Sequence, residues 1–97
     1  MYISSPTNER IKSLVRLSTQ SAERKRLGAF LVEGSKEVQM ALDAGFEILE
    51  YYHCTKMGAP VPSVTEEQYF EISETAFRKV AYREGSDGVI AVFRTPE

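Results

Sequence analysis

Residues 24–36 constrain the fold more than any other stretch of this 97-residue chain. Three consecutive cations, Arg24, Lys25 and Arg26, come shortly before Gly28, and an apolar run over residues 29–32 follows and leads to Gly34. Glycine commonly ends helices, and a short continuous apolar run is typical of a strand buried on both faces. The stretch therefore predicts a basic helix end, a buried strand and a glycine turn into another helix.

The rest of the chain continues this alternation. Apolar residues at helical spacing, with serines as candidate caps, predict four helices, over residues 6–20, 22–27 (capped by Ser21), 36–44 (capped by Ser35) and 74–81 (capped by Ser73). Runs of β-forming residues predict four strands, over residues 29–32, 46–54, 67–72 and 89–93. Strands that alternate with helices predict an α/β fold with a mixed, mostly parallel four-stranded sheet.

Length and cysteine content limit the class of protein. A chain of 97 residues is long enough for one domain. No apolar run approaches the roughly 18 residues that a membrane helix needs, and Cys54 is the single cysteine, so no internal disulfide can form. We therefore expect a one-domain protein in a reducing, cytoplasmic compartment.

Charge is distributed unevenly along the chain. The net charge is −2, but residues 1–36 hold seven cations and three anions, and residues 37–97 hold five cations and eleven anions. A basic first third on an acidic body is a candidate footprint for a polyanion such as a nucleic acid. A solvated helix face that is merely basic would give the same pattern.

Residue patterns of known catalytic and metal sites are largely missing from the sequence. His53 and Cys54 are neighbours, and neighbours on a strand point to opposite faces of the sheet, so they are not expected to form a nucleophile–base pair. The chain has no CxxC, HExxH, GxSxG or GxxxxGK motif. The sequence therefore favours binding over catalysis and indicates no metal site.

Three segments are candidates for ligand contact. The turn at residues 33–36 starts a helix, where free N–H groups and Lys36 favour an anion; alternatively, Gly34 only permits the turn and Glu33 pairs with Arg24 or Arg26. The cations at residues 24–26 can bind phosphates and, with Lys12 and Lys36, form a continuous basic surface; otherwise they are a solvated helix face. The glycines at residues 85–88 permit close backbone approach, or serve as a connection only.

Together these residues resemble a known family, the N-terminal substrate-binding domain of the SpoU (TrmH-type) RNA 2′-O-ribose methyltransferases. The most specific part is Phe-Leu-Val-Glu-Gly at residues 30–34, after a basic helix end, and Gly-Val-Ile-Ala-Val at residues 88–92 adds to it. The other matching positions are Asn8, Ile11, Lys12, Leu14, Leu17, Arg26, Ala41, Leu42 and Gly45.

The resemblance implies a fold and an RNA-binding role. The family's domain is a three-layer α/β/α sandwich similar to small ribosomal proteins that bind kinked RNA, and it holds rRNA or tRNA. Here the last loop is Gly-Ser-Asp-Gly where the family often has Thr, Gln and Pro, and the segment between the second and third strands is short. The RNA-contact residues that the motif positions and the basic patch suggest are Asn8, Lys12, Arg24, Lys25, Arg26, Glu33, Gly34, Lys36 and Ser86.

The resemblance also implies a longer enzyme. Residues 1–97 would be its RNA substrate-binding domain, and a knotted domain expected after Glu97 would bind S-adenosylmethionine, methylate a ribose 2′-hydroxyl and form a homodimer. The chain itself would then hold neither a cofactor site nor a catalytic residue, and rRNA would be the favoured substrate. Two alternatives stay open: a free-standing ribosome-associated RNA-binding module of the same fold, and a small-ligand protein that binds an anionic metabolite at the helix start after Gly34.

Overall fold

A computed structural model describes residues 1–58, 64–81 and 86–96. Its sheet has the strand order β1-β4-β3-β5-β2, with the strands β1 (Tyr2–Ile3), β2 (Ala29–Glu33), β3 (Ile48–His53), β4 (Tyr69–Ile72) and β5 (Val89–Arg94). The pairs β1–β4 and β3–β4 are parallel, and the pairs β3–β5 and β2–β5 are antiparallel. The predicted mixed sheet is confirmed, but it has five strands instead of four, and its described pairs are half antiparallel instead of mostly parallel.

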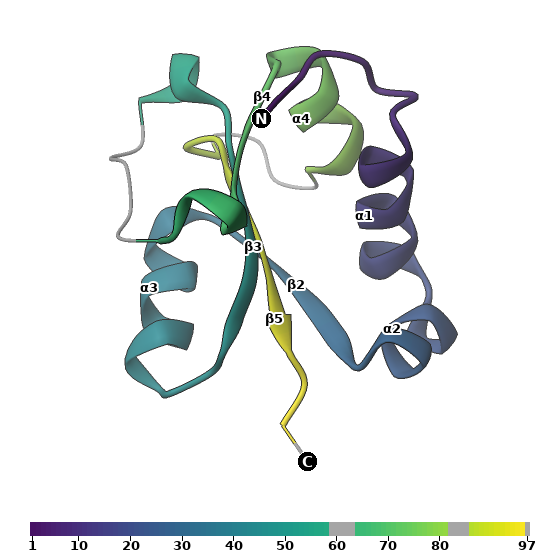
Figure 1. The fold of residues 1–97 in the computed structure, drawn as a ribbon, viewed down its shortest axis with the longest axis vertical. Helices are drawn as coiled ribbons and strands as arrows, with labels where there is room; N and C mark the ends of the chain where they lie inside the picture. The colour runs from purple at the N-terminus through teal and green to yellow at the C-terminus, as the bar shows by residue number, and fades with distance from the viewer. Residues whose placement is uncertain (59–63, 82–85, 97) are drawn as a thin grey trace.

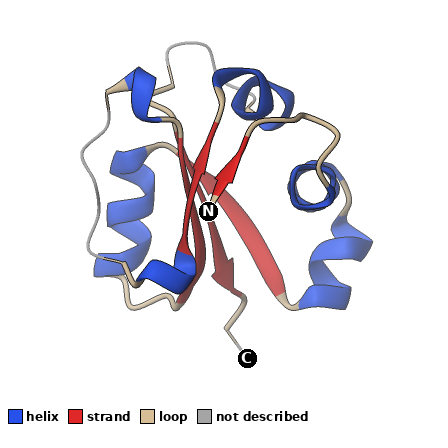
Figure 2. Ribbon diagram, turned by 45° about the horizontal axis from the view of Figure 1, so that its top comes forward, coloured by secondary structure: helices blue, strands red, loops and turns tan. Residues whose placement is uncertain are grey.

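Helices cover both faces of this sheet, so the three-layer α/β/α arrangement is confirmed. The helices are α1 (Glu9–Thr19), α2 (Ser21–Leu27), α3 (Ser35–Asp43) and α4 (Glu74–Val80), with short 3-10 turns η1 (Thr55–Met57) and η2 (Glu66–Gln68). Figures 1 and 2 show α1, α2 and α4 on one face and α3 on the other. No helix in the described ranges is long and apolar enough to cross a membrane.

Strand β5 lies at the centre of two hydrophobic cores. Ile90 and Val92 pack with the α1 and α4 side chains, whereas Val89, Ala91 and Phe93 pack with the α3 side. All five residues are buried. This alternation explains why the sequence shows a continuous apolar run, since both faces of the strand are covered.

The start of α1 differs from the prediction. The helix begins at Glu9 instead of Pro6, and Asn8 is its N-cap, whose side-chain oxygen accepts a 2.8 Å hydrogen bond from the Arg10 amide. Residues before Asn8 form a turn in which the Asn8 amide donates to the Ser5 carbonyl at 3.2 Å. Because Asn8 supplies the cap, the chain enters the helix three residues later than proline placement suggested.

The predicted caps of the other helices are right in one case of three. Ser73 caps α4, since its hydroxyl accepts a 3.1 Å bond from the Ala76 amide. The N-caps of α2 and α3 are Gln20 and Gly34, neither with a side-chain cap bond, and Ser21 and Ser35 are the first helical residues. At the other end of α2, Gly28 has the predicted role: its φ of 61° ends the helix.

Candidate nucleic-acid interface

Strand β2 divides the predicted contact residues into two groups. Arg24, Lys25 and Arg26 come before the strand, whereas Glu33, Gly34 and Lys36 come at or after its far end. At about 3.3 Å per residue, a five-residue strand is about 16 Å long. The prediction of one continuous basic surface over both groups is therefore wrong, because an extended strand separates residues that are close in sequence.

At the start of α3, where Glu33, Gly34 and Lys36 lie, a carboxylate of the protein itself occupies the helix N-terminus. The Ser35 amide donates to both carboxylate oxygens of Asp87, at 3.1 and 3.3 Å, and the Ser35 hydroxyl donates to Asp87 as well. A negative charge there stabilises the positive end of the helix dipole. Asp87 thus takes the place that an anionic ligand would need, which disfavours the small-ligand alternative.

The charges near this helix start are mostly negative. Glu33, Glu37 and Asp87 face a single cation, Lys36, among the described residues of α3, the adjoining end of β2 and the loop at residues 86–88. The structure places strand β2 between Glu33 and both Arg24 and Arg26, and the bonds described for these arginines are to Leu17 and Glu23.

The loop before β5 is tightly packed where the structure describes it. A Cβ added to Gly88, whose φ is +88°, would lie 2.7 Å from the Cys54 carbonyl oxygen and 2.8 Å from the Met57 Cβ. Ser86 places its hydroxyl oxygen out of contact with solvent and without a hydrogen bond in the described structure. Gly85 lies outside the described residues. The close backbone approach at Gly88 is thus to the η1 segment, and an RNA contact by Ser86 stays a prediction.

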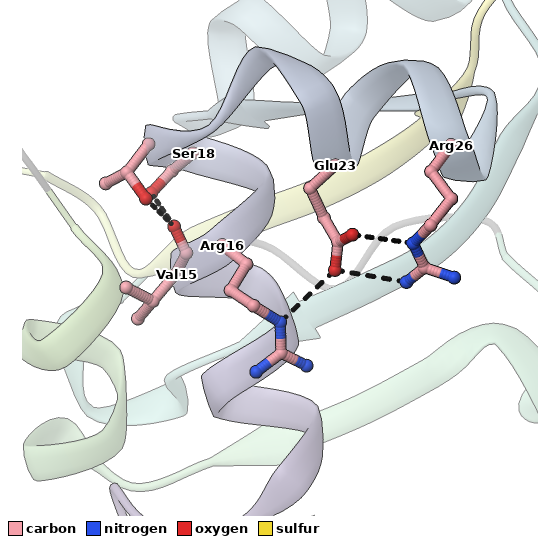
Figure 3. A network of polar contacts seen from close by, with 6 residues as sticks. Val15, Arg16, Ser18, Glu23 and Arg26 are labelled. Atoms are coloured by element: carbon pink, nitrogen blue, oxygen red, sulfur yellow. Dashed lines mark hydrogen bonds and ion pairs between the residues drawn. The ribbon is translucent and has the colours of Figure 1, made fainter.

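The other group forms a compact basic surface where α1 meets α2. We call it the basic corner and define it as Arg16, Glu23, Arg24, Lys25 and Arg26. Glu23 bridges the two helices: its Oε2 accepts a 3.2 Å bond from Arg16 Nε, and its Oε1 and Oε2 accept bonds of 2.7 and 3.1 Å from Arg26 (Figure 3). Four cations against one carboxylate leave the basic corner with a clear positive excess.

Arg24 and Lys25 have different environments within the basic corner. Arg24 Nη1 donates a 2.7 Å bond to the Leu17 carbonyl in the last turn of α1. Carbonyls in a last helical turn have no partner inside the helix, so this bond stabilises the junction of the two helices. Lys25 makes no ion pair with any described residue and lies exposed.

Lys12 extends the basic corner along α1, and Asn8 does not. Lys12 lies one turn before Arg16 on the same helix stripe and makes a loose 3.7 Å ion pair with Glu9. Its side chain is half exposed. Asn8 uses its side-chain oxygen as the helix cap, so the structure gives it a structural role, and its contact with RNA stays a prediction.

Arg16 is the site residue that sequence reasoning missed. Arg16 and Glu23 are seven residues apart and lie on different helices, because the chain turns at Gln20, whose φ and ψ are −125° and 113°. Spacing along one helix cannot reveal such a pair. The hydrogen bond from Arg26, together with that from Arg16, lowers the pKa of Glu23, so the bridging group stays a carboxylate at neutral pH.

His53 and Cys54 belong to the core. Both side chains are buried, and His53 Nδ1 lies 2.9 Å from the Tyr69 hydroxyl oxygen. Tyr51 and Tyr69 rings also contact the His53 ring. No group of three His, Cys, Asp or Glu side chains in the described ranges is placed to hold a metal ion.

Two shallow hollows lie at the end of β5, and one of them adjoins the basic corner. One, of about 370 Å³, is lined by Arg24, Lys25, Gly28, Ala29, Phe30 and Thr95. The other, of about 410 Å³, is lined by Ala44, Gly45, Phe46, Glu47, Arg94 and Pro96. Among the described lining residues, the carboxylate of Glu47 bonds to Arg94 at 3.1 Å.

Comparisons with known proteins agree with this fold. The family model for the MRM3-like substrate-binding domain matches residues 8–91. A solved RNA 2′-O ribose methyltransferase superposes with a TM-score of 0.80 and 35% identity, over 100% of this chain and 38% of its own. A comparison with curated proteins finds no match.

Two further solved structures share the fold. An rRNA methyltransferase from Sinorhizobium meliloti has a TM-score of 0.76 and 23% identity, over 99% of this chain and 37% of its own. A TrmH-family RNA methyltransferase, described as putative, from Porphyromonas gingivalis has a TM-score of 0.74 and 25% identity, over 93% of this chain and 36% of its own. The chain thus spans less than two fifths of the length of these proteins, and it belongs to the family of MRM3-like substrate-binding domains, as found in SpoU/TrmH-type RNA methyltransferases.

Proposed function

We propose that this chain is the RNA-recognition domain of an S-adenosylmethionine-dependent RNA 2′-O-ribose methyltransferase, with rRNA as the favoured substrate and tRNA as the second choice. The observation that carries this proposal is the basic corner, on a domain whose family binds methyltransferase substrates. Its four cations concentrate positive charge on a chain whose net charge is −2. Such a patch is what phosphate recognition requires.

The basic corner would act by positioning the substrate. Arg16, Lys25 and Arg26 present side-chain donors to phosphates, and phosphate contacts fix the register of a nucleic acid without reading its sequence. Arg24 bonds to the last turn of α1 and so helps to hold together the two helices that carry those donors. The domain therefore contributes affinity and orientation, and no proton or group transfer is assigned to it.

The chemistry would take place elsewhere in a longer protein. S-adenosylmethionine would supply the methyl group in a catalytic domain that follows the recognition domain, and that domain would also form the homodimer. The S. meliloti protein named above has been solved with its methyl donor bound. A cytoplasmic location fits these roles, since rRNA and tRNA substrates are available there.

The test is a paired charge removal on two similar helices. Lys25→Ala with Arg26→Ala removes two cations from the last turn of α2, and Arg78→Ala with Lys79→Ala removes two cations from the last turn of the equally long α4. Binding of a fluorescein-labelled hairpin RNA is measured by anisotropy over a range of salt concentrations. We expect the α2 pair to weaken binding and to reduce the salt slope by about 1.4 to 1.8, the value for two lost phosphate contacts.

The α4 pair is the matched control because it changes net charge by the same amount. If both pairs reduce the salt slope equally, binding follows overall charge and the basic corner has no special role. If the unaltered chain does not bind RNA at all, the proposed function is wrong. Retention on ribosomes that does not depend on the corner would favour the free-standing ribosome-associated module instead.

A further inference from the structure

The bridge at Glu23 fixes the positions of two guanidinium groups that come from different helices. Arg16 projects from α1 and Arg26 from α2, and both bond to the same carboxylate (Figure 3). The Glu23 side chain is 13% exposed, whereas those of Arg16 and Arg26 are 42% and 65% exposed. The carboxylate is thus set into the surface, and the two cations stand beside it toward solvent.

Both arginines keep donors that no described residue uses. A guanidinium has five N–H donors. Arg16 bonds to Glu23 through Nε alone, which leaves both of its Nη groups, and Arg26 uses Nε and Nη2, which leaves Nη1. These remaining N–H groups are available to a ligand on the solvent side.

The two arginines are close enough to share one phosphate. Arg16 Nε and Arg26 Nη2 lie 3.2 and 3.1 Å from the same oxygen, Glu23 Oε2. The two bonded nitrogens are therefore at most about 6.3 Å apart, which sets the two guanidinium groups side by side. A tetrahedral phosphate can accept charge-assisted bonds of about 2.8 Å from the N–H groups that each of them leaves unused. Two guanidinium groups held side by side can donate more hydrogen bonds to a phosphodiester than a single cation can.

We propose that Arg16 and Arg26 form one binding site for an RNA phosphate, and that Glu23 is its positioning residue. The proposal rests on the proposed function, since it names the group of the RNA that the basic corner holds. Glu23 contributes by keeping two long side chains in one arrangement before the RNA arrives. Without it, binding would have to order both side chains, at a cost in affinity.

The proposal predicts an effect opposite to that of simple charge. Glu23→Gln removes a negative charge from a surface that binds a polyanion, so charge alone predicts tighter binding. A fixed arginine pair predicts weaker binding, by about three- to tenfold, because two flexible side chains lose their anchor. The direction of the change therefore separates the two explanations.

A matched variant exists on α4. Glu74 bonds to Arg78 through Nε and Nη2 at 3.0 and 2.6 Å, so Glu74→Gln also removes a carboxylate that bonds to an arginine, away from the basic corner. Affinity for the hairpin RNA is measured at one salt concentration for both variants. We expect weaker binding for Glu23→Gln only. Binding by Glu23→Gln that equals or exceeds that of the unaltered chain would overturn the proposal.

A second background tests whether Glu23 acts through the arginines. When Arg16→Ala and Arg26→Ala are already present, adding Glu23→Gln should change affinity less than twofold. An equal loss in both backgrounds would show that Glu23 supports the fold in general, and would overturn its positioning role. Unfolding by urea is measured for each variant, so that a loss of stability is not read as a loss of binding.

Arg16→Lys keeps the experiment decisive if Glu23→Gln does not fold. Lysine retains the charge but lacks the planar fork, so we expect weaker RNA binding at unchanged net charge. Arg78→Lys on α4 is the control. Equal affinity of Arg16→Lys and the unaltered chain would refute the shared phosphate site. Such a result would leave the proposed function standing as long as the unaltered chain still binds RNA with a salt dependence.

Discussion

Removing the Asp87 carboxylate should loosen the start of α3. Asp87 accepts hydrogen bonds from the Ser35 amide and hydroxyl, across 52 residues of sequence. It acts as a helix cap supplied by a distant loop. Loss of a side-chain cap costs about 0.5–2 kcal/mol, and loss of a negative charge at a helix N-terminus costs about 0.3–1 kcal/mol. We therefore expect Asp87→Ala to lower the free energy of unfolding by about 1–2 kcal/mol.

Two independent readouts test this. Urea unfolding gives the free energy directly, and thermal unfolding should show a Tm lower by roughly 4–8 °C for each kcal/mol lost. The second readout is Tyr51. Burial, and secondly the negative charge of Asp87, raise its pKa from 10.0 to about 12. In Asp87→Ala the tyrosinate absorbance of Tyr51 should appear at lower pH, because the negative charge of Asp87 no longer disfavours ionisation.

The control is a cap formed locally. Ser73→Ala removes the hydroxyl that accepts the Ala76 amide bond at the start of α4, and it should destabilise the domain without moving the Tyr51 titration. An Asp87→Ala variant as stable as the unaltered chain would refute the capping role. It would also reopen the start of α3 as a place for an anionic ligand, since the carboxylate would then be only loosely held.

Three further predictions concern the core and its pH dependence. Gly88→Ala should lower the free energy of unfolding by about 2–4 kcal/mol in urea, since the φ of +88° strains alanine and its Cβ would overlap Cys54 and Met57. Leu14→Ala should lower the free energy of unfolding by about 2–5 kcal/mol in the same assay, because Leu14 is 1% exposed between α1 and the sheet. If either variant is as stable as the unaltered chain, the packing described is contradicted. As pH rises from about 10 toward 12, the unfolded chain ionises Tyr51 while the folded chain holds it protonated, so stability should fall in that interval, and less steeply in Tyr51→Phe.

Elements with a clear local signal could be predicted from the sequence. Residues 89–93 read as a strand because β5 is covered on both faces, so every position is apolar. Gly28 was predicted to end a helix because helices often end in a left-handed residue, which is usually glycine. The φ of Gly28, 61°, lies in that left-handed region. In contrast, β1 is only Tyr2–Ile3 and shows no periodicity; it is a strand because the edge of β4 pairs with it.

Contacts between distant residues account for most of what was missed at the site. Nothing local marks Asp87 as the partner of Ser35, or Glu23 as the link between Arg16 and Arg26, since each contact depends on how two elements meet. Ser35 was predicted as a cap from its residue type, but its hydroxyl donates to Asp87 instead. The predicted continuous basic surface conflicts with the strand itself. An extended strand of five residues separates residues 24–26 from residues 34–36 by about 16 Å.

The central claim is that RNA binds at the basic corner and not at the start of α3. Amide chemical-shift mapping tests this claim most directly. Isotope-labelled chain is titrated with the hairpin RNA, and the shifted amides are placed on the structure. The account predicts shifts concentrated on α2 and the second half of α1, around Arg16, Glu23, Lys25 and Arg26, with residues 34–36 and 86–88 little changed. Shifts concentrated at residues 34–36 and 86–88, with the basic corner silent, would contradict it.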